Sequence, residues 1–196
     1  DNKAKAVSII VTNPENGEIL AMVNKPDFNP NTVRDEVATY DELQKLWRNR
    51  SVNDIYEPGS IFKIITSIAA IEEGIISDKD SFVCDGHKEV GGRIIHCWKR
   101  TGHGTQNFAQ ILQNSCNVGF MEIGERLGAE TLNKYIKKFG FGEKTQLDLP
   151  GEAKGIIKKT ENISSVDLAT ISFGQTNAST PIQILTAVNA IANDGV

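Results

Sequence analysis

YEPGSIFKIITSIAAI, residues 56–71, contains one lysine in a segment that is apolar or small from Pro58 onward. On a helical wheel at about 100° per residue, Ser60, Lys63, Ser67, Ala70 and Gly74 share one narrow sector, and the remaining surface up to Ile71 is apolar apart from threonine. A helix that is apolar on nearly all sides is a core helix. We therefore expect residues 60–74 to form a buried helix whose narrow polar strip faces a site.

Two interpretations of Ser60 and Lys63 follow. Ser60 could be a helix N-cap while Lys63 reaches water, but a capping box has Glu or Gln at the lysine position, and a cation in the first turn opposes the helix dipole. Alternatively, burial and the helix terminus lower the lysine pKa, so that the neutral amine takes a proton from Ser60 one turn away. The Ser60 N–H could then face a developing oxyanion. This second pattern predicts the nucleophile and base of an acyl transfer.

Strand and helix signals are segregated along the chain. Alternating apolar residues around Asn16-Gly17 predict a hairpin over residues 1–26, and Gly91-Gly92 predicts a second hairpin over residues 82–98. Helical periodicity dominates residues 107–196. Strands and helices that do not alternate indicate an α+β fold, expected here as part of a single domain.

Composition excludes some classes of function. The chain of 196 residues has a net charge of −4 and no basic stripe, so we expect no nucleic-acid partner. It shows no apolar run that could span a bilayer and no signal peptide. The sequence begins in a strand pattern and stops at the end of an apolar helix, so we expect a piece of a larger protein.

Several motifs resemble one family. Ser60-Ile-Phe-Lys63 resembles the S-x-x-K motif of penicillin-binding proteins and serine β-lactamases. Five longer segments resemble class B penicillin-binding proteins, the monofunctional peptidoglycan D,D-transpeptidases, in the same order and over essentially the whole chain. The five segments are NPENGEILAM, NRSVNDIYEPGSIFKI, GHGTQNFAQILQNSCN, LDLPGE and SFGQTNASTPIQILTAVNAIANDG. IIHCWKRTGHG is most similar to the sporulation branch. The resemblance implies the α+β fold of these enzymes, an antiparallel sheet packed on helices plus a mostly helical subdomain.

The second family motif, S-x-N, matches Ser115-Cys116-Asn117. The resemblance implies that Ser115 relays a proton to the leaving amine and that Asn117 holds the substrate amide and contacts Lys63. Residues two apart do not share a helix face, so this tripeptide must be a turn between two helices. The alternative is a simple cap or turn, and Ser51-Val52-Asn53 fits S-x-N as well, but only Ser115 follows S-x-x-K as the family requires.

The third family motif, K-T-G, is missing. Lys144-Thr145 is followed by Gln, and Lys159-Thr160 is followed by Glu. In the family this motif lies on a strand downstream of the point where the sequence stops, and it supplies a second oxyanion donor. We therefore expect the C-terminal strands to be missing and this chain alone to carry an incomplete site.

The resemblance implies a reaction and its partners. Ser60 would attack D-Ala-D-Ala stem peptides of peptidoglycan, β-lactam antibiotics would acylate it, and no cofactor would be needed for catalysis. Membrane proteins of cell-wall assembly are expected partners, at the outer face of the cytoplasmic membrane, with an anchor upstream of Asp1. The alternatives are a β-lactam receptor or non-catalytic scaffold module, and a serine β-lactamase that uses Glu152 as its base.

Five of the six cysteines and histidines lie close together in the sequence, at Cys84, His87, His96, Cys97 and His103. A regular hairpin pairs residue 87 with 96 and makes Cys84 and Cys97 diagonal neighbours, which allows a disulfide or two free thiols. A bend at Asp85-Gly86 would instead bring Cys84, His87 and Cys97 around a structural Zn²⁺, with Asp85, His96 or His103 as the fourth ligand. Zinc is favoured because a disulfide does not explain the histidines. Cys116 is expected to be a small buried filler.

Overall fold

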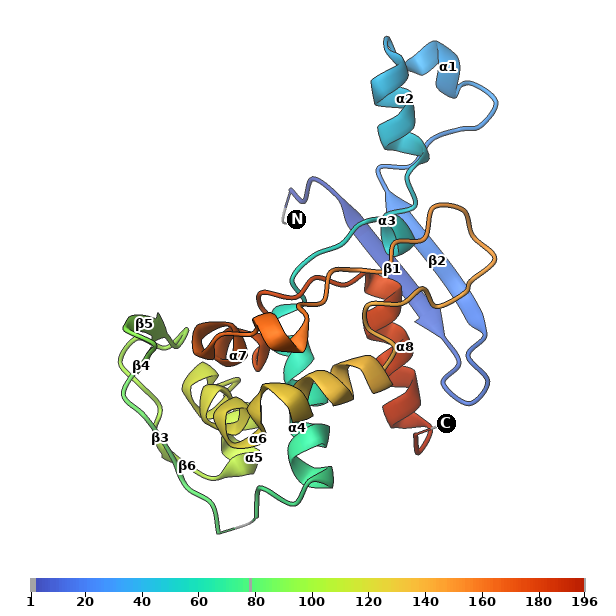
Figure 1. Cartoon of the computed structure of the whole chain (residues 1–196). Helices are drawn as coiled ribbons and strands as arrows, with labels where there is room; N and C mark the ends of the chain where they lie inside the picture. The colour runs from blue at the N-terminus through green and yellow to red at the C-terminus, as the bar shows by residue number, and fades with distance from the viewer. Residues whose placement is uncertain (1–2, 78, 196) are drawn as a thin grey trace. The chain divides into compact units, whose positions relative to one another are not determined.

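The computed structural model describes residues 3–77 and 79–195 and divides into two compact units (Figure 1). Unit 1 comprises Asp1–Ile55, Glu143–Lys154 and Thr180–Val196. Unit 2 comprises Tyr56–Gly142 and Gly155–Ser179. Helices and antiparallel strands occur in separate segments, so the predicted α+β class is confirmed. Among the described residues, none of the helices has the length and apolar character that crossing a bilayer requires.

Unit 1 begins with the predicted hairpin. Its elements are β1 (Val7–Thr12), β2 (Ile19–Lys25), α1 (Val33–Glu36), α2 (Tyr40–Trp47), α3 (Arg50–Asn53) and α8 (Pro181–Ala192). β1 and β2 are antiparallel, with Ile9 opposite Val23. The turn is closed by the Gly17 N–H, which donates to Asn13 O at 2.8 Å, and Gly17 has φ +74°, a conformation that favours glycine. The hairpin thus spans Val7–Lys25, within the predicted residues 1–26, of which residues 1 and 2 lie outside the described part of the chain.

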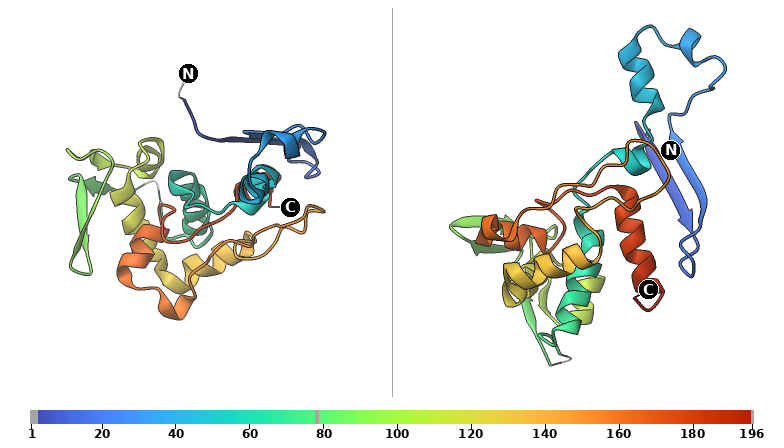
Figure 2. Two further views of the ribbon diagram at one scale, coloured as in Figure 1. Left: turned by 90° about the horizontal axis from the view of Figure 1, so that it is seen from above. Right: turned by 45° about the vertical axis from the view of Figure 1, so that its right-hand side comes forward.

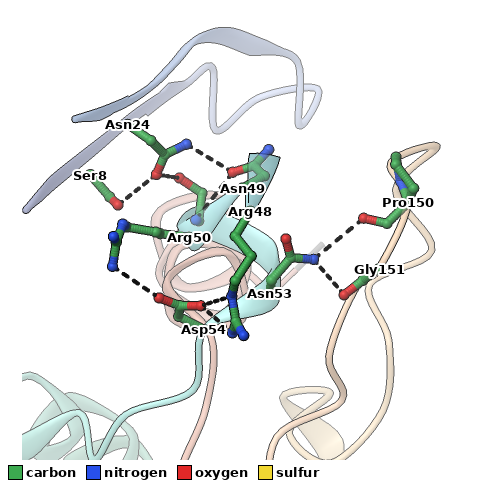
Figure 3. A network of polar contacts seen from close by, with 10 residues as sticks. Ser8, Asn24, Arg48, Asn49, Arg50, Asn53, Asp54, Pro150 and Gly151 are labelled. Carbon is green, nitrogen blue, oxygen red and sulfur yellow. Dashed lines mark hydrogen bonds and ion pairs between the residues drawn. The ribbon is translucent and has the colours of Figure 1, made fainter. Parts of the chain in front are cut away.

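Polar contacts join α3 and α8 to this hairpin. Ser51 Oγ donates to Asn24 Oδ1 at 3.1 Å, and Thr12 Oγ1 donates to Asn189 Oδ1 at 3.0 Å. Figure 3 shows the network around Asn24, in which Asn53 Nδ2 also donates to the carbonyl of Gly151. Ser51 and Asn53 therefore have structural partners. This agrees with the choice of Ser115-Cys116-Asn117, and not Ser51-Val52-Asn53, as the S-x-N motif.

Unit 2 contains the helix that the sequence placed in the core. Its elements are η1 (Gly59–Phe62), α4 (Lys63–Glu72), β3 (Phe82–Cys84), β4 (His87–Val90), β5 (Arg93–His96), β6 (Gly104–Gln106), α5 (Phe108–Gln113), α6 (Asn117–Lys138), η2 (Thr160–Asn162) and α7 (Ser165–Ile171). The expected helix over residues 60–74 is one 3₁₀ turn followed by α4. α6 is interrupted at Gly128, which has φ +75° and ψ 163°.

The core of unit 2 forms where α6 packs against both α4 and α7 (Figures 1 and 2). A Cβ on Gly124 would lie 2.7 Å from Ser172 Cβ. The absence of a side chain at Gly124 therefore allows α6 and α7 to approach each other closely. The buried apolar side chains of this core include Phe62, Ile65, Ala69, Phe120, Met121, Ile123, Leu132, Ile136, Phe141 and Ile171. Burial of these side chains is the main source of stability in such a unit.

The second predicted hairpin is shorter than expected. His87 pairs with His96 across Gly91-Gly92 as predicted, but β3 pairs with β6 and not with the residues that follow β5. The chain turns sharply at Gly86, where φ is +88° and a Cβ would lie 2.0 Å from Arg100 O. This close approach ends the hairpin and redirects β3. The expected helical part, residues 107–196, contains α5 to α8 but also a long irregular segment between α6 and α7.

Candidate active site

Ser60 and Lys63 lie at the start of the core helix, where Ser60 is exposed and Lys63 is buried. Pro58 is the N-cap of η1 and Phe62 that of α4, and neither makes a side-chain capping bond. Lys63 is only 1% exposed. The interpretation of Ser60 as an N-cap with a solvent-directed Lys63 is therefore wrong.

The Lys63 amine is surrounded by oxygens from Ser60 and from the S-x-N segment. Nζ lies 2.8 Å from Ser115 O, 2.8 Å from Asn117 Oδ1, 3.0 Å from Ser115 Oγ and 3.3 Å from Ser60 Oγ. Ser115 O and Asn117 Oδ1 can only accept hydrogen bonds, so they accept from the two N–H groups of a neutral amine. The lone pair is then free to accept from a hydroxyl, and this arrangement suits a base.

Burial lowers the pKa of Lys63 to about 8, while the neighbouring thiols of Cys97 and Cys116 act in the opposite direction. An ordinary lysine has a pKa of 10.5 and is almost wholly charged at neutral pH. With a pKa near 8, about one molecule in ten carries the neutral amine at pH 7. A fraction of the molecules therefore has a neutral amine, which can act as a base, at neutral pH.

The S-x-N segment forms the predicted turn. α5 ends at Gln113 and α6 begins at Asn117; Ser115 between them has φ +50°, which is rare for a residue with a side chain. The Cys116 N–H donates to Ile111 O at 2.8 Å and fixes the turn. Both Ser115 and Asn117 consequently face Lys63.

A second segment supports the backbone around Ser60, and sequence reasoning missed it. The Gly59 N–H donates to Gly174 O at 2.8 Å, and Thr66 Oγ1 donates to Ser172 O at 2.9 Å. The Thr176 N–H donates to Glu57 Oε1 at 2.8 Å. The glycine in SFGQT was a signal of a tight turn, but nothing local to it indicated which segment it would contact.

The cysteine and histidine cluster differs from the predicted ligand set. Ligand atoms of Cys84, Cys97, His103 and Cys116 all lie within 4.8 Å of one another, with Cys84 Sγ 3.5 Å and Cys97 Sγ 3.6 Å from His103 Nδ1. His87 instead faces His96 across the hairpin, with ring centroids 6.0 Å apart, and neither His87, His96 nor Asp85 belongs to this cluster. Cys116 is buried as expected, but its sulfur is a member of the cluster.

The four side chains suit a soft metal ion. A tetrahedral Zn²⁺ holds its sulfur and nitrogen ligands about 3.5 to 3.8 Å apart, close to the two sulfur–nitrogen distances here. Burial raises the pKa of the Cys116 thiol to about 11. For the Cys97 thiol, burial is outweighed by the backbone N–H groups of Lys99, Asn117 and Val118, so its pKa is lowered. Nε2 of His103 is buried with no partner among the described residues. All three cysteine thiols are free.

Glu152, the base of the β-lactamase alternative, is occupied within unit 1. Its carboxylate accepts from the Thr145 N–H at 2.7 Å and from the Gln146 N–H at 3.2 Å, which closes the loop that contains Lys144-Thr145. Ser60 belongs to unit 2. These bonds give Glu152 a structural role.

Comparison with known proteins agrees with this geometry. The Penicillin binding protein transpeptidase domain family matches residues 7–196. Stage V sporulation protein D of Bacillus subtilis (strain 168) is 50% identical over 189 residues, 95% of this chain and 28% of that protein. Peptidoglycan D,D-transpeptidase FtsI of Escherichia coli (strain K12) is 29% identical over 195 residues, 100% of this chain and 32% of that protein.

Solved structures give the same result for the fold. The transpeptidase domain of penicillin-binding protein 3 from Burkholderia pseudomallei has a TM-score of 0.82 and 28% identity, covering 98% of this chain and 51% of that one. PBP2 in the complex with MreC from Helicobacter pylori has a TM-score of 0.83 and 31% identity, covering 95% of this chain and 38% of that one. The chain spans 28% and 32% of the two curated relatives named above. It belongs to the penicillin-binding protein transpeptidase domain family, in the class B branch.

Proposed function

We propose that this chain carries the serine-acylating half of a peptidoglycan D,D-transpeptidase site. The observation that supports it best is the convergence of Ser60, Ser115 and Asn117 on one buried amine, Lys63 Nζ, at 2.8 to 3.3 Å. A hydroxyl beside a neutral amine is the pairing that nucleophilic acyl transfer needs. The name of one relative, peptidoglycan D,D-transpeptidase FtsI of Escherichia coli, supports the same reaction class.

The proposed acylation balances as follows. Ser60 Oγ bonds to the carbonyl carbon of the penultimate D-alanine while its proton passes to neutral Lys63. Ser115 Oγ, 3.0 Å from Nζ, then relays a proton to the nitrogen of the terminal D-alanine, which leaves as the amide bond breaks. Asn117 holds the substrate amide. An amine of a second stem attacks the ester and frees Ser60.

The oxyanion needs two donors, and we propose that this chain supplies one of them, the Ser60 N–H, while a K-T-G strand supplies the other. Loss of a single donor typically slows acyl transfer by about 10² to 10³-fold. The test is intact mass after incubation with benzylpenicillin, on this chain and on a longer chain that continues through K-T-G, each with a Ser60→Ala control. An adduct on the longer chain that the control lacks supports the proposal. No adduct on either chain overturns it.

The alternatives differ in what happens to the adduct. A β-lactamase would release hydrolysed penicillin quickly, whereas a transpeptidase holds the adduct and releases D-alanine from a peptide ending in D-Ala-D-Ala. A receptor or scaffold module would form the adduct and release no D-alanine. The bonds made by Glu152 weigh against the β-lactamase, because that carboxylate is already occupied by its own loop.

We propose that the partners include membrane proteins of cell-wall assembly, with the whole protein anchored at the outer face of the cytoplasmic membrane. The support for a protein partner is that a structurally similar protein, PBP2 of Helicobacter pylori, was solved in a complex with MreC; the membrane location rests on the family resemblance. Co-purification of the full-length protein from membranes, with and without detergent, would test the location. Recovery of the full-length protein without membranes would contradict it.

We also propose a structural Zn²⁺ held by Cys84, Cys97, His103 and Cys116, in place of the set predicted from the sequence. Bound zinc would cross-link the β-segments to the S-x-N turn, because Cys116 lies between Ser115 and Asn117. Elemental analysis of protein purified without chelator should give one zinc per chain, and Cys116→Ser should lower that content while His87→Ala does not. Absence of zinc, with a mass lower by two hydrogens and a peptide map that joins Cys84 to Cys97, would identify that disulfide instead.

A further inference from the structure

Trp98 is a large aromatic residue that is exposed and yet held in a fixed orientation. The residue is 63% exposed. Its indole Nε1 donates to Asn114 O at 2.9 Å, and its ring meets the ring of His103 edge-on, with centroids 5.3 Å apart. Two directed contacts thus fix a side chain whose apolar surface stays in solvent. Burial of apolar surface does not explain this arrangement, because most of that surface is not buried.

The position of Trp98 relates it to the candidate active site. Asn114, which accepts the indole N–H, is followed directly by Ser115. Asn117 Nδ2 donates to His96 O at 3.4 Å, two residues before Trp98. Residues 96–98 therefore run beside the S-x-N turn, on the Ser115 and Asn117 side of Lys63. A substrate held by Asn117 lies next to this segment.

We infer that Trp98 is a substrate-contact residue whose exposed ring packs against the part of the acyl donor that precedes D-Ala-D-Ala. The inference rests on the proposed function, in which Asn117 holds the amide on that side of the reacting carbonyl. In a penicillin the same place is taken by the acylamino side chain. A rigid aromatic ring suits this role, because it offers contact area with little loss of conformational freedom on binding.

The inference is tested by comparing two penicillins that differ only in the group that would meet Trp98. Benzylpenicillin carries an aromatic acyl side chain, and 6-aminopenicillanic acid carries none. Trp98→Ala should lower the second-order rate constant of acylation by benzylpenicillin by about 2- to 10-fold, the usual worth of an aromatic contact. The rate constant for 6-aminopenicillanic acid should fall less, because this penicillin has no acyl side chain that could contact Trp98. Rates are measured on the longer chain that includes K-T-G.

Two further variants separate contact from structural support. Trp98→Phe keeps a ring but loses the bond to Asn114 O, so it should give an intermediate loss with benzylpenicillin. Trp47→Ala removes the other tryptophan of the chain, which is 41% exposed in unit 1, and should change neither rate. If Trp98→Ala slows both penicillins equally, Trp98 only supports the turn and the inference is wrong. Unchanged rates with both penicillins overturn it as well.

A fluorescence measurement keeps this inference apart from the proposed chemistry. In a Ser60→Ala variant of the longer chain in which Trp47 and any tryptophan outside the present sequence are replaced by Phe, emission comes from Trp98 alone and no covalent step can occur at Ser60. Addition of an acetylated tripeptide ending in D-Ala-D-Ala should change its emission saturably. A saturable change without acylation in the wild type would leave the contact standing and overturn the proposed function. No change would overturn the contact even if the wild type is acylated.

Discussion

Replacing Gly174 by alanine should damage both the stability of unit 2 and the reactivity of Ser60. Gly174 has φ +88°, and its carbonyl accepts the Gly59 N–H at 2.8 Å. An added Cβ would lie 2.0 Å from Gly59 O and 2.7 Å from Phe62 Cβ. Neither atom is the end of a flexible side chain, so the turn and the segment before Ser60 would have to move apart.

The magnitude follows from two separate costs. A residue with a Cβ in the left-handed region costs about 1–2 kcal/mol, and overpacking of a close contact adds about 1–3 kcal/mol. Gly174→Ala should therefore lower the free energy of unfolding by about 2–5 kcal/mol. Gly140→Ala is the matched control, because Gly140 has φ +80° and a Cβ there would have no neighbour within 4 Å. It should show the conformational cost alone.

Both variants are compared by urea unfolding and by labelling with a fluorescent penicillin at a temperature where both are folded. We expect Gly174→Ala to be the less stable of the two and to label more slowly, and we expect Gly140→Ala to label normally. Equal loss of stability in the two variants, together with normal labelling of Gly174→Ala, would refute the reasoning. The turn would then not support the backbone before Ser60.

Three further predictions concern ionisable groups. Because burial lowers the pKa of Lys63 to about 8 and the neutral amine is the base, the acylation rate constant should rise with pH and level off above about 8; a flat stopped-flow profile between about pH 6 and 9 would contradict this. The pKa of Lys63 is about 8 in the folded chain and 10.5 in the unfolded chain, so between these pH values the unfolded chain binds more protons than the folded one. The free energy of unfolding should therefore rise with pH from about 8 to 10.5, and this rise should be absent in Lys63→Met. Hydrogen bonds from Lys158 and Ser164 hold the pKa of Asp167 at about 2, so ionised Asp167 contributes to the free energy of unfolding above pH 3.8, and this contribution is lost as pH falls toward 2. Asp167→Asn should therefore lower the free energy of unfolding by about 1 kcal/mol at pH 7 and by less at lower pH. An equal difference at all pH values in urea unfolding would contradict this.

The sequence predicts the parts of this molecule that depend on neighbouring residues. Ser60 and Lys63 meet because residues three apart share a helix face, and the β1–β2 hairpin forms because Asn-Gly suits its turn. The turn at Ser115 was also predictable, since two side chains spaced by two residues can face one amine only outside a helix. Each of these features depends on residues that are only a few positions apart in the sequence.

The features that sequence analysis missed depend on contacts between distant segments. Gly174 supports Gly59 from more than a hundred residues away, and no periodicity carries that information. The pairing of β3 with β6 follows from a close backbone approach at Gly86, which a glycine allows but does not specify. Cys116 joins the cluster for the same reason, because its position depends on how α5 and α6 pack.

We propose Ser60, and not Ser115, as the nucleophile, although both hydroxyls lie close to the same amine. Lys63 Nζ lies 3.3 Å from Ser60 Oγ and 3.0 Å from Ser115 Oγ, so distance to the base does not distinguish them. The most direct measurement is tandem mass spectrometry of the peptide that carries the penicilloyl adduct, from the longer chain that includes K-T-G. We expect an adduct on Ser60 that still forms, more slowly, in Ser115→Ala and is absent in Ser60→Ala. An adduct on Ser115, or one that persists in Ser60→Ala, would contradict it.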